Sequence, residues 1–184
     1  MTDMENCSNL TFSDPVYSAD LSDAAVINHQ LLQEYLAVNN HPDTHKTHHF
    51  MGRFENTYLP VEQLPSLPSI IASIVNCAVK ITGVDEDRLQ YGFWFNEMHP
   101  GHKTSLHTHE ENDELLSAVY YITAPKESGD LVVKSLNGDV HHKAVAGRAY
   151  FFKPDLPHSV TENLSQTMRL SVAFNFGLKE TGDD

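Results

Sequence analysis

The half of the chain that follows Asp87 is a succession of short apolar runs, rich in Val, Tyr, Phe and Thr and separated by Gly, Pro and Asn. Runs of this length and composition predict β-strands. Asn137-Gly138, between two of the runs, is a strong signal for a tight antiparallel hairpin. We therefore predict a mainly β fold, a double-stranded β-helix or jelly roll of the cupin-like kind. The predicted strands are 89–98, 103–109, 116–124, 129–136, 139–145, 148–153, 157–163 and 168–176.

Two segments in the first half of the chain have apolar residues at helical spacing. The first runs from Ser22 to Val38 and the second from about Pro68 to Thr82, where the proline suits a first helical turn. The predicted strand 116–124 contains SAVYYITA, which is apolar on both faces. Because both faces of such a strand must be covered, we expect the two N-terminal helices to pack on the outside of the sheet.

A chain of 184 residues can bury a core without disulfides or a structural metal, and we expect a single domain over residues 1–184. Residues 1–20 are polar and predict an extended lead-in. Residues 21–87 predict a helical N-terminal part, and residues 88–178 the jelly-roll core. Within the helical part, residues 41–60 (HPDTHKTHHFMGRFENTYLP) are too polar and irregular to predict a helix or strand.

Acidic residues outnumber basic ones, with 25 Asp and Glu against 12 Lys and Arg and a net charge of −13. Such a charge repels phosphate backbones and anionic lipids, so we expect no nucleic-acid partner and no membrane partner. Cys7 and Cys77 show neither metal-ligand spacing nor a disulfide framework. No signal-peptide pattern opens the chain. We expect a reduced, cytoplasmic protein, and the sequence leaves open whether it forms a homodimer.

Three histidines are candidate metal ligands. His107 and His109 are two residues apart in a predicted strand, so their imidazoles point to the same side. His158 begins a later strand, which a jelly roll brings close to the first two residues. A neutral imidazole is a common ligand for iron, zinc, copper and nickel. A lone His-x-His is more often a solvated polar face, and His158 is what favours an open metal site.

The last predicted strand, RLSVAFNFG, carries a second pair of candidate residues. Alternation places its Leu, Val and Phe side chains on one face and Arg169 and Ser171 on the other. A guanidinium beside a hydroxyl suits a carboxylate, because the guanidinium can donate two parallel hydrogen bonds. Alone, Arg169 would be read as a surface arginine. Its coincidence with the histidines favours an anion-binding role.

These motifs carry a resemblance. Residues 91–177 resemble the 2-oxoglutarate- and iron(II)-dependent oxygenases, above all a group of small bacterial and phage proteins with a His-x-His motif. The similarity lies in Asn96 and Gly101 ahead of that motif, then in SAVYYITAP, GDLVV, AGRAYFFKPDLPHSV and RLSVAFNF. The interval of eleven residues between His158 and Arg169 is also typical of such enzymes.

The resemblance implies that His107 and His158 bind Fe(II). It also implies that Arg169 and Ser171 bind the C5 carboxylate of the cosubstrate 2-oxoglutarate. The chain departs from the family at one ligand, because the family has a carboxylate where this sequence has His109. We prefer a site of His107, His109 and His158.

Two other ligand sets stay open. In the first, Glu111 supplies a carboxylate within a His-x-Glu motif formed with His109. In the second, Glu114 completes a motif similar to that of the metal-dependent cupins, in which iron, manganese, zinc or nickel would be bound and Arg169 would have no role.

The favoured function is a 2-oxoglutarate- and iron(II)-dependent dioxygenase or hydroxylase, acting on a small-molecule or protein substrate that the sequence does not specify. One alternative is a metal-dependent cupin, a dioxygenase or an isomerase that does not use 2-oxoglutarate. Another is a non-catalytic module that binds a small molecule or a protein. Binding of 2-oxoglutarate separates the oxygenase from the cupin, and its turnover to succinate separates catalytic activity from mere binding.

Overall fold

The computed structural model of the protein describes residues 7, 9–50, 52–109 and 113–180. Its helices are α1 (Ala24–Val38) and α2 (Leu67–Thr82). Its strands are β1 (Thr11–Ser13), β2 (Val16–Asp20), β3 (His45–Phe50), β4 (Arg53–Tyr58), β5 (Leu89–Met98), β6 (Thr104–His107), β7 (Leu116–Thr123), β8 (Asp130–Ser135), β9 (Gly138–Lys143), β10 (Arg148–Phe152), β11 (His158–Val160) and β12 (Arg169–Leu178). Short 3-10 turns lie at Val61–Gln63 and Glu86–Arg88.

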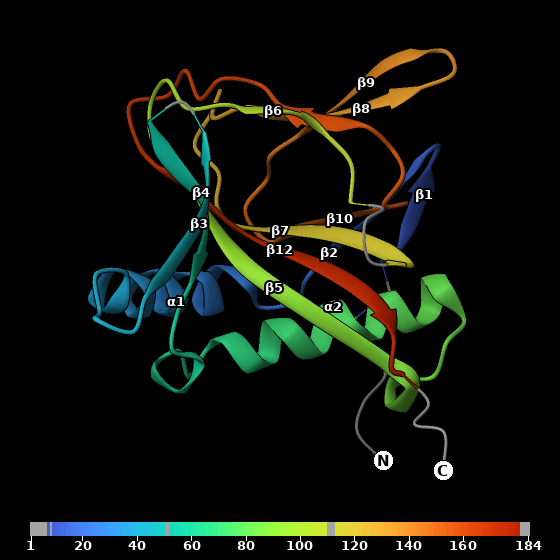
Figure 1. Ribbon diagram of the computed structural model, residues 1–184, viewed down its shortest axis with the longest axis horizontal. Coiled ribbons are helices and arrows are strands. Elements are labelled where there is room, and N and C mark those ends of the chain that lie inside the picture. Colours follow the sequence, from blue (N-terminus) through green and yellow to red (C-terminus); the bar gives the residue numbers. More distant parts are fainter. Residues whose placement is uncertain (1–6, 8, 51, 110–112, 181–184) are drawn as a thin grey trace.

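The strands form two antiparallel sheets that face each other (Figure 1). The larger sheet has the order β1-β2-β10-β7-β12-β5-β4-β3, and the smaller one has the order β6-β11-β8-β9. The eight strands predicted between residues 88 and 178 are confirmed as β5 to β12, with ends that differ by a few residues. The prediction of a jelly roll is therefore confirmed.

Strand β12 lies at the centre of the larger sheet, between β5 and β7. Its Leu170, Val172, Phe174 and Phe176 are fully buried in the main apolar core, on the side of the helices. Arg169 and the other alternate residues face the smaller sheet, as the period of two predicts. One strand thus separates the core that stabilises the fold from the space between the sheets.

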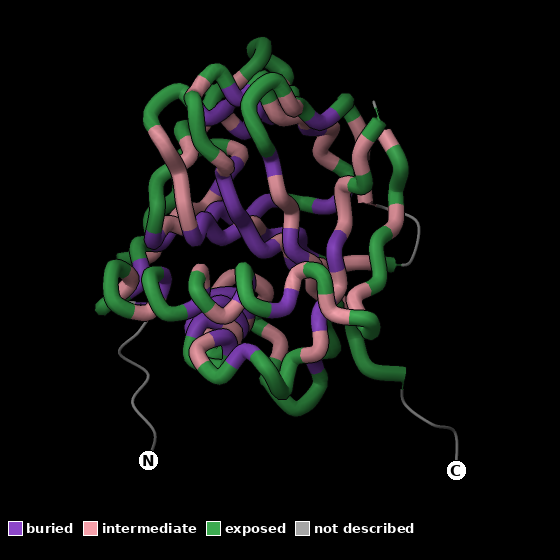
Figure 2. Tube along the Cα trace, turned by 90° about the vertical axis from the view of Figure 1, so that its left-hand side faces the viewer, coloured by how far each residue is buried: buried purple, intermediate pink, exposed green. Residues whose placement is uncertain are grey.

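Both predicted helices are confirmed, and both pack on the outside of the larger sheet (Figure 1). The buried stripe of α2 includes Ile70, Ile74, Cys77 and Ala78, at the helical spacing that brings one face to the sheet. Burial of each large aliphatic side chain contributes about 1.5–3 kcal/mol. Figure 2 shows this buried layer running from the helix into the strands above it.

The prediction that residues 41–60 form no regular element is wrong. Strands β3 and β4 form an antiparallel hairpin, and β4 joins the larger sheet where Thr57 pairs with Phe95. The hairpin is at the edge of the sheet, and most of its side chains are exposed or half-buried. Because backbone pairing, and not apolar alternation, holds such an edge, the polar sequence does not reveal it.

The prediction for residues 1–20 also needs correction within the described part. Thr11–Ser13 and Val16–Asp20 are strands β1 and β2, and β2 pairs with β10. The N-terminal segment is therefore part of the larger sheet and not a separate lead-in.

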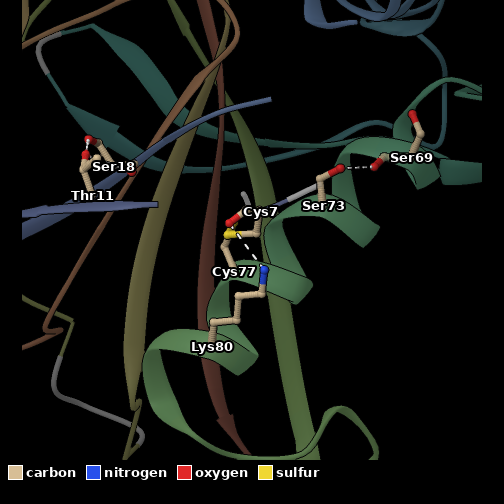
Figure 3. Close-up of a disulfide and its surroundings, with 7 residues drawn as sticks. All are labelled: Cys7, Thr11, Ser18, Ser69, Ser73, Cys77 and Lys80. Carbon is tan, nitrogen blue, oxygen red and sulfur yellow. Dashed lines mark hydrogen bonds between the residues drawn. A yellow bond between two sulfur atoms is a disulfide. The ribbon is translucent and has the colours of Figure 1, made fainter. Parts of the chain in front are cut away.

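Cys7 and Cys77 form a disulfide, which corrects the expectation of a reduced protein without disulfides (Figure 3). Both residues are buried, and Cys77 comes from the core-facing stripe of α2. The Lys80 Nζ donates a hydrogen bond to the Cys7 carbonyl oxygen at 3.4 Å. Because the two cysteines are 70 positions apart, their spacing in the sequence carries no sign of the pairing. The bond ties the N-terminal segment to the helix that covers the sheet.

We expect reduction of this disulfide to lower the free energy of unfolding by about 4 kcal/mol, the loop-closure value for a link across 70 residues. Urea denaturation with and without dithiothreitol measures the difference. A Cys7→Ala variant is the control, since its midpoint should be low and insensitive to the reductant. Equal midpoints for the wild-type protein under both conditions would contradict the prediction.

Within the described residues, no helix is long and apolar enough to cross a membrane.

Candidate metal centre

The three predicted histidines come together between the sheets. His107 ends β6 and is paired with His158 at the start of β11, and His109 follows two residues after His107. One ligand nitrogen from each lies within 4.8 Å of the others. The ring centroids are 4.3 Å apart for His107 and His158, 4.9 Å for His107 and His109, and 5.0 Å for His109 and His158. Three nitrogen ligands at such distances can meet one metal ion.

Backbone carbonyl groups orient two of the three rings. The Nδ1 of His107 lies 2.8 Å from the Ser105 carbonyl oxygen, and the Nδ1 of His158 lies 2.9 Å from the Leu156 carbonyl oxygen. Because a carbonyl oxygen only accepts hydrogen bonds, each Nδ1 carries the proton and donates it. The Nε2 of each ring keeps its lone pair. Metal-binding histidines are held by hydrogen bonds of this kind.

The site also favours the uncharged imidazole. Burial, together with the neighbouring His107, lowers the pKa of His158 to about 3 and that of His109 to about 4. Both rings are therefore neutral near pH 7, the protonation state that binds a metal ion. The donor set fits a divalent transition metal on three counts: residue type, distance and protonation.

The structure bears differently on Glu111 and Glu114, the two alternative carboxylate ligands. Glu111 lies outside the described residues. Glu114 lines the same cavity as the histidines, and its charge opposes part of the lowering of the His109 pKa that burial causes. Among the described residues, the cluster of His, Cys, Asp and Glu side chains with ligand spacing consists of the three histidines alone.

Arg169 lies in the same cavity and is almost fully buried. Its Nη1 donates to the Gly129 carbonyl oxygen at 3.2 Å, and its Nη2 contacts the Met98 Sδ. The face of the Tyr121 ring lies 5.4 Å from the guanidinium carbon. Its Nε is buried and has no hydrogen-bond partner among the described residues.

None of the ion pairs within the described residues involves Arg169. Burial lowers the pKa of this guanidinium, which still remains charged near neutral pH. A buried cation without an anion is costly, by several kcal/mol for an unpaired ion. Ser171, also buried, follows Arg169 on the same side of β12. An anionic ligand that enters the cavity would offset this cost.

One cavity of about 610 Å³ joins the two groups of residues. Its walls include the three histidines, Arg169 and Ser171. The structure thus places the five predicted site residues around one space between the sheets. A volume of this order accommodates a cosubstrate and part of a second molecule.

Several further cavity residues were not predicted to have a role. Trp94, which the sequence indicates as a core aromatic, is half-buried in the cavity wall, with its ring 5.9 Å from that of His109. Asn96, Ser117 and Asn175 also line the space, on the strands beside Arg169 and Ser171. Alternation along β5, β7 and β12, counted from Ser171, would have found all four.

The polar hairpin adds to the cavity as well. His48 and Asn56 line it, and the Asn56 Nδ2 lies 3.0 Å from the His48 Nδ1. Arg53 does not line it. That side chain instead bridges Glu55, at 3.1 Å, and the carbonyl oxygen of Lys103, also at 3.1 Å.

No protein-family model and no curated protein sequence matches the chain. Solved structures match it over most of its length. A prolyl-4-hydroxylase of Pseudomonas putida is 17% identical, with 90% of this chain and 93% of that chain covered and a TM-score of 0.66.

Two other structures extend the comparison. A prolyl hydroxylase from Trichoplax adhaerens, in complex with a peptide of the hypoxia inducible factor oxygen degradation domain, is 11% identical; 90% of this chain and 84% of that one are covered, with a TM-score of 0.70. EvdO2 of Micromonospora carbonacea var. aurantiaca, complexed with 2-oxoglutarate, is 15% identical; the shares are 90% and 89% and the TM-score is 0.61. The chain has the fold that these enzymes share.

Proposed function

We propose that the protein is a 2-oxoglutarate- and iron(II)-dependent oxygenase. His107, His109 and His158 would hold the iron, and Arg169 and Ser171 would bind the C5 carboxylate of 2-oxoglutarate. The observation that carries the proposal is the buried Arg169, which has no anionic partner among the described residues and lies in the same cavity as three clustered histidines. A metal site alone requires no buried cation, whereas a dicarboxylate cosubstrate requires one as the partner of its far carboxylate.

Iron(II) held there with 2-oxoglutarate supplies the oxidation of a substrate C–H bond by oxygen, with succinate and carbon dioxide as coproducts. The protein's own contribution is orientation and the exclusion of water. The carbonyl groups of Ser105 and Leu156 fix two imidazoles before the metal arrives. Arg169 is fixed by Gly129 and Tyr121, so its guanidinium loses little freedom when it binds a carboxylate.

The similar structures support this assignment through their fold and through the ligands bound in two of them. EvdO2 has been solved with 2-oxoglutarate, and the Trichoplax enzyme with a peptide. For this chain they leave both a small molecule and a protein segment as classes of primary substrate.

The test is a titration of 2-oxoglutarate into the iron(II)-loaded protein without oxygen. A weak visible charge-transfer absorption should appear and saturate at one equivalent. Slow formation of succinate on admission of air would then support turnover. Absence of any binding by the iron-loaded wild-type protein would exclude the oxygenase and leave the metal-dependent cupin ahead.

Glu114 separates the oxygenase from the cupin on the side of the metal. We expect Glu114→Gln to keep the metal content near that of the wild type, because the three histidines form the ligand cluster without it. Metal analysis after anaerobic loading and gel filtration measures this. A loss as large as that caused by His107→Ala would make Glu114 a ligand and favour the cupin.

A further inference from the structure

The larger sheet provides a regular floor for the cavity. Along β12, Arg169, Ser171, Ala173 and Asn175 all line it, in the alternation expected of a strand. The first and the last are six positions apart, so the floor is about 20 Å long at about 3.3 Å per residue. A five-carbon diacid is only about 6 Å long. With its far carboxylate on Arg169, 2-oxoglutarate therefore leaves the part of the floor beyond Ser171 uncovered.

The residue at the middle of this floor, Ala173, has a small side chain and lies near the histidines. Ala173 is paired with Trp94 on one side and with Val119 on the other, and all three line the cavity. The Trp94 ring lies 5.9 Å from the His109 ring. The small side chain of Ala173 leaves space in the cavity beside the indole of Trp94, which in turn lies next to His109.

The end of the floor offers one oriented hydrogen-bond donor. Asn175 is paired with Ser117 and with Gly92, which has no side chain. The Ser117 hydroxyl donates to the Asn175 Oδ1 at 2.9 Å. The Oδ1 accepts this bond, and no described residue accepts a hydrogen bond from the Nδ2. The amide nitrogen of Asn175 is thus a donor held ready in the cavity wall.

The charges in the cavity argue against an acidic substrate. Among the described residues that line it there is no lysine, and Arg169 is the sole arginine. The two lining carboxylates are Glu55, which Arg53 pairs at 3.1 Å, and Glu114. Once Arg169 holds the cosubstrate, a carboxylate or phosphate on a second molecule would find no lysine or arginine in this wall.

We infer that the floor beyond Ser171 is the primary-substrate subsite, and that it selects an uncharged molecule. Its reacting carbon would lie over Ala173 beside Trp94, and a carbonyl or similar acceptor would bind the Asn175 Nδ2. The two points are one pleat repeat apart, about 7 Å. The inference rests on the proposed function, because the position of 2-oxoglutarate defines which part of the cavity remains for a second molecule.

The experiment uses three probes that differ only in the head group: 3-phenylpropanamide, 3-phenylpropanoate and 3-phenylpropylamine. Each is titrated without oxygen into the protein loaded with iron(II) and 2-oxoglutarate. Trp94 is the single tryptophan of the chain, so its fluorescence reports on this wall alone. We expect the amide to bind about threefold to tenfold more tightly than the amine, which has no acceptor for the Asn175 Nδ2. The amide should also bind more tightly than the acid, whose charge would lose its hydration with no lysine and no further arginine in this wall.

Asn175→Asp is the matched variant, since its carboxylate can still accept the bond from Ser117. It should weaken binding of the amide about threefold to tenfold and make the amine the tightest of the three probes. Its affinity for 2-oxoglutarate should equal that of the wild type, because Asn175 lies about 13 Å from Ser171 along the strand. Ala173→Leu should abolish binding of all three probes and spare that of 2-oxoglutarate.

Three results would overturn the inference: a wild-type preference for the acid, an order unchanged by Asn175→Asp, or no response to any probe while 2-oxoglutarate binds. If 2-oxoglutarate itself fails to bind the iron-loaded wild type, it is the proposed function that fails. The two failures are therefore distinguishable in one series of titrations.

Discussion

Replacement of His158 by alanine should lower the affinity for iron(II) by at least about 100-fold, since loss of a mere supporting hydrogen bond already costs 10- to 100-fold. His158 is the most buried of the three histidines and the one contributed by a separate strand, β11. His107 and His109 alone would leave a two-nitrogen site on one segment. Anaerobic titration with iron(II), followed by the fluorescence of Trp94, measures the change, because the indole lies 5.9 Å from His109.

His29→Ala is the matched control for this prediction. His29 is exposed on α1, outside the residues that line the cavity, and the substitution suits a helix. It should leave both the metal content and the fluorescence response unchanged. If His158→Ala and His107→Ala keep the wild-type affinity while remaining folded, the three histidines do not form the metal site.

The parts of the molecule that follow a simple period could be predicted from the sequence. Strand β12 is the clearest case, because Leu170, Val172, Phe174 and Phe176 alternate with polar or small residues along its length. That alternation predicts both the core and the direction in which Arg169 and Ser171 point. The helices follow for the same reason, since the stripe of α2 repeats at helical spacing. Given the topology of a jelly roll, the sequence also predicts that His107 and His158 lie close together.

The parts that were missed depend on pairings between distant segments. The hairpin of β3 and β4 is held by backbone hydrogen bonds, so its side chains carry no strand pattern. The Cys7–Cys77 bond joins residues 70 positions apart, and such a closure leaves no local mark. Trp94 is similar, because alternation along β5 shows that its side chain faces the cavity only once the register of β5 with β12 is known. The sequence therefore did not reveal the residues whose role depends on contacts between distant segments.

The charge of the buried Arg169 connects the stability of the fold with the binding of a ligand. The protein is strongly acidic, yet the cavity contains a buried guanidinium and no acid paired with it among the described residues. Folding therefore bears the cost of desolvating Arg169, and Gly129, Met98 and Tyr121 offset only part of it. A ligand that brings a carboxylate to this point recovers the remainder. The cosubstrate would thus stabilise the fold as well as take part in the chemistry.

Arg169→Ala should weaken the binding of 2-oxoglutarate by more than about tenfold, because loss of one partner from a buried charge pair costs roughly 2–5 kcal/mol. The iron content should stay near that of the wild type, since Arg169 is not one of the three clustered ligands. Ser171→Ala removes one neutral donor and should cost about 0.5–1.5 kcal/mol. The charge-transfer absorption of the iron-loaded protein, titrated anaerobically with 2-oxoglutarate, gives both values.

Arg169→Lys tests whether charge or geometry dominates. Lysine keeps the cation but donates from a single point, so it should restore part of the affinity that alanine loses and remain weaker than the two-pronged guanidinium. Urea denaturation of each variant with and without 2-oxoglutarate checks folding independently, and the stabilisation by the cosubstrate should follow the same order. Wild-type affinity in Arg169→Ala, with iron still bound, would show that the carboxylate binds elsewhere in the cavity and that the buried arginine has another role.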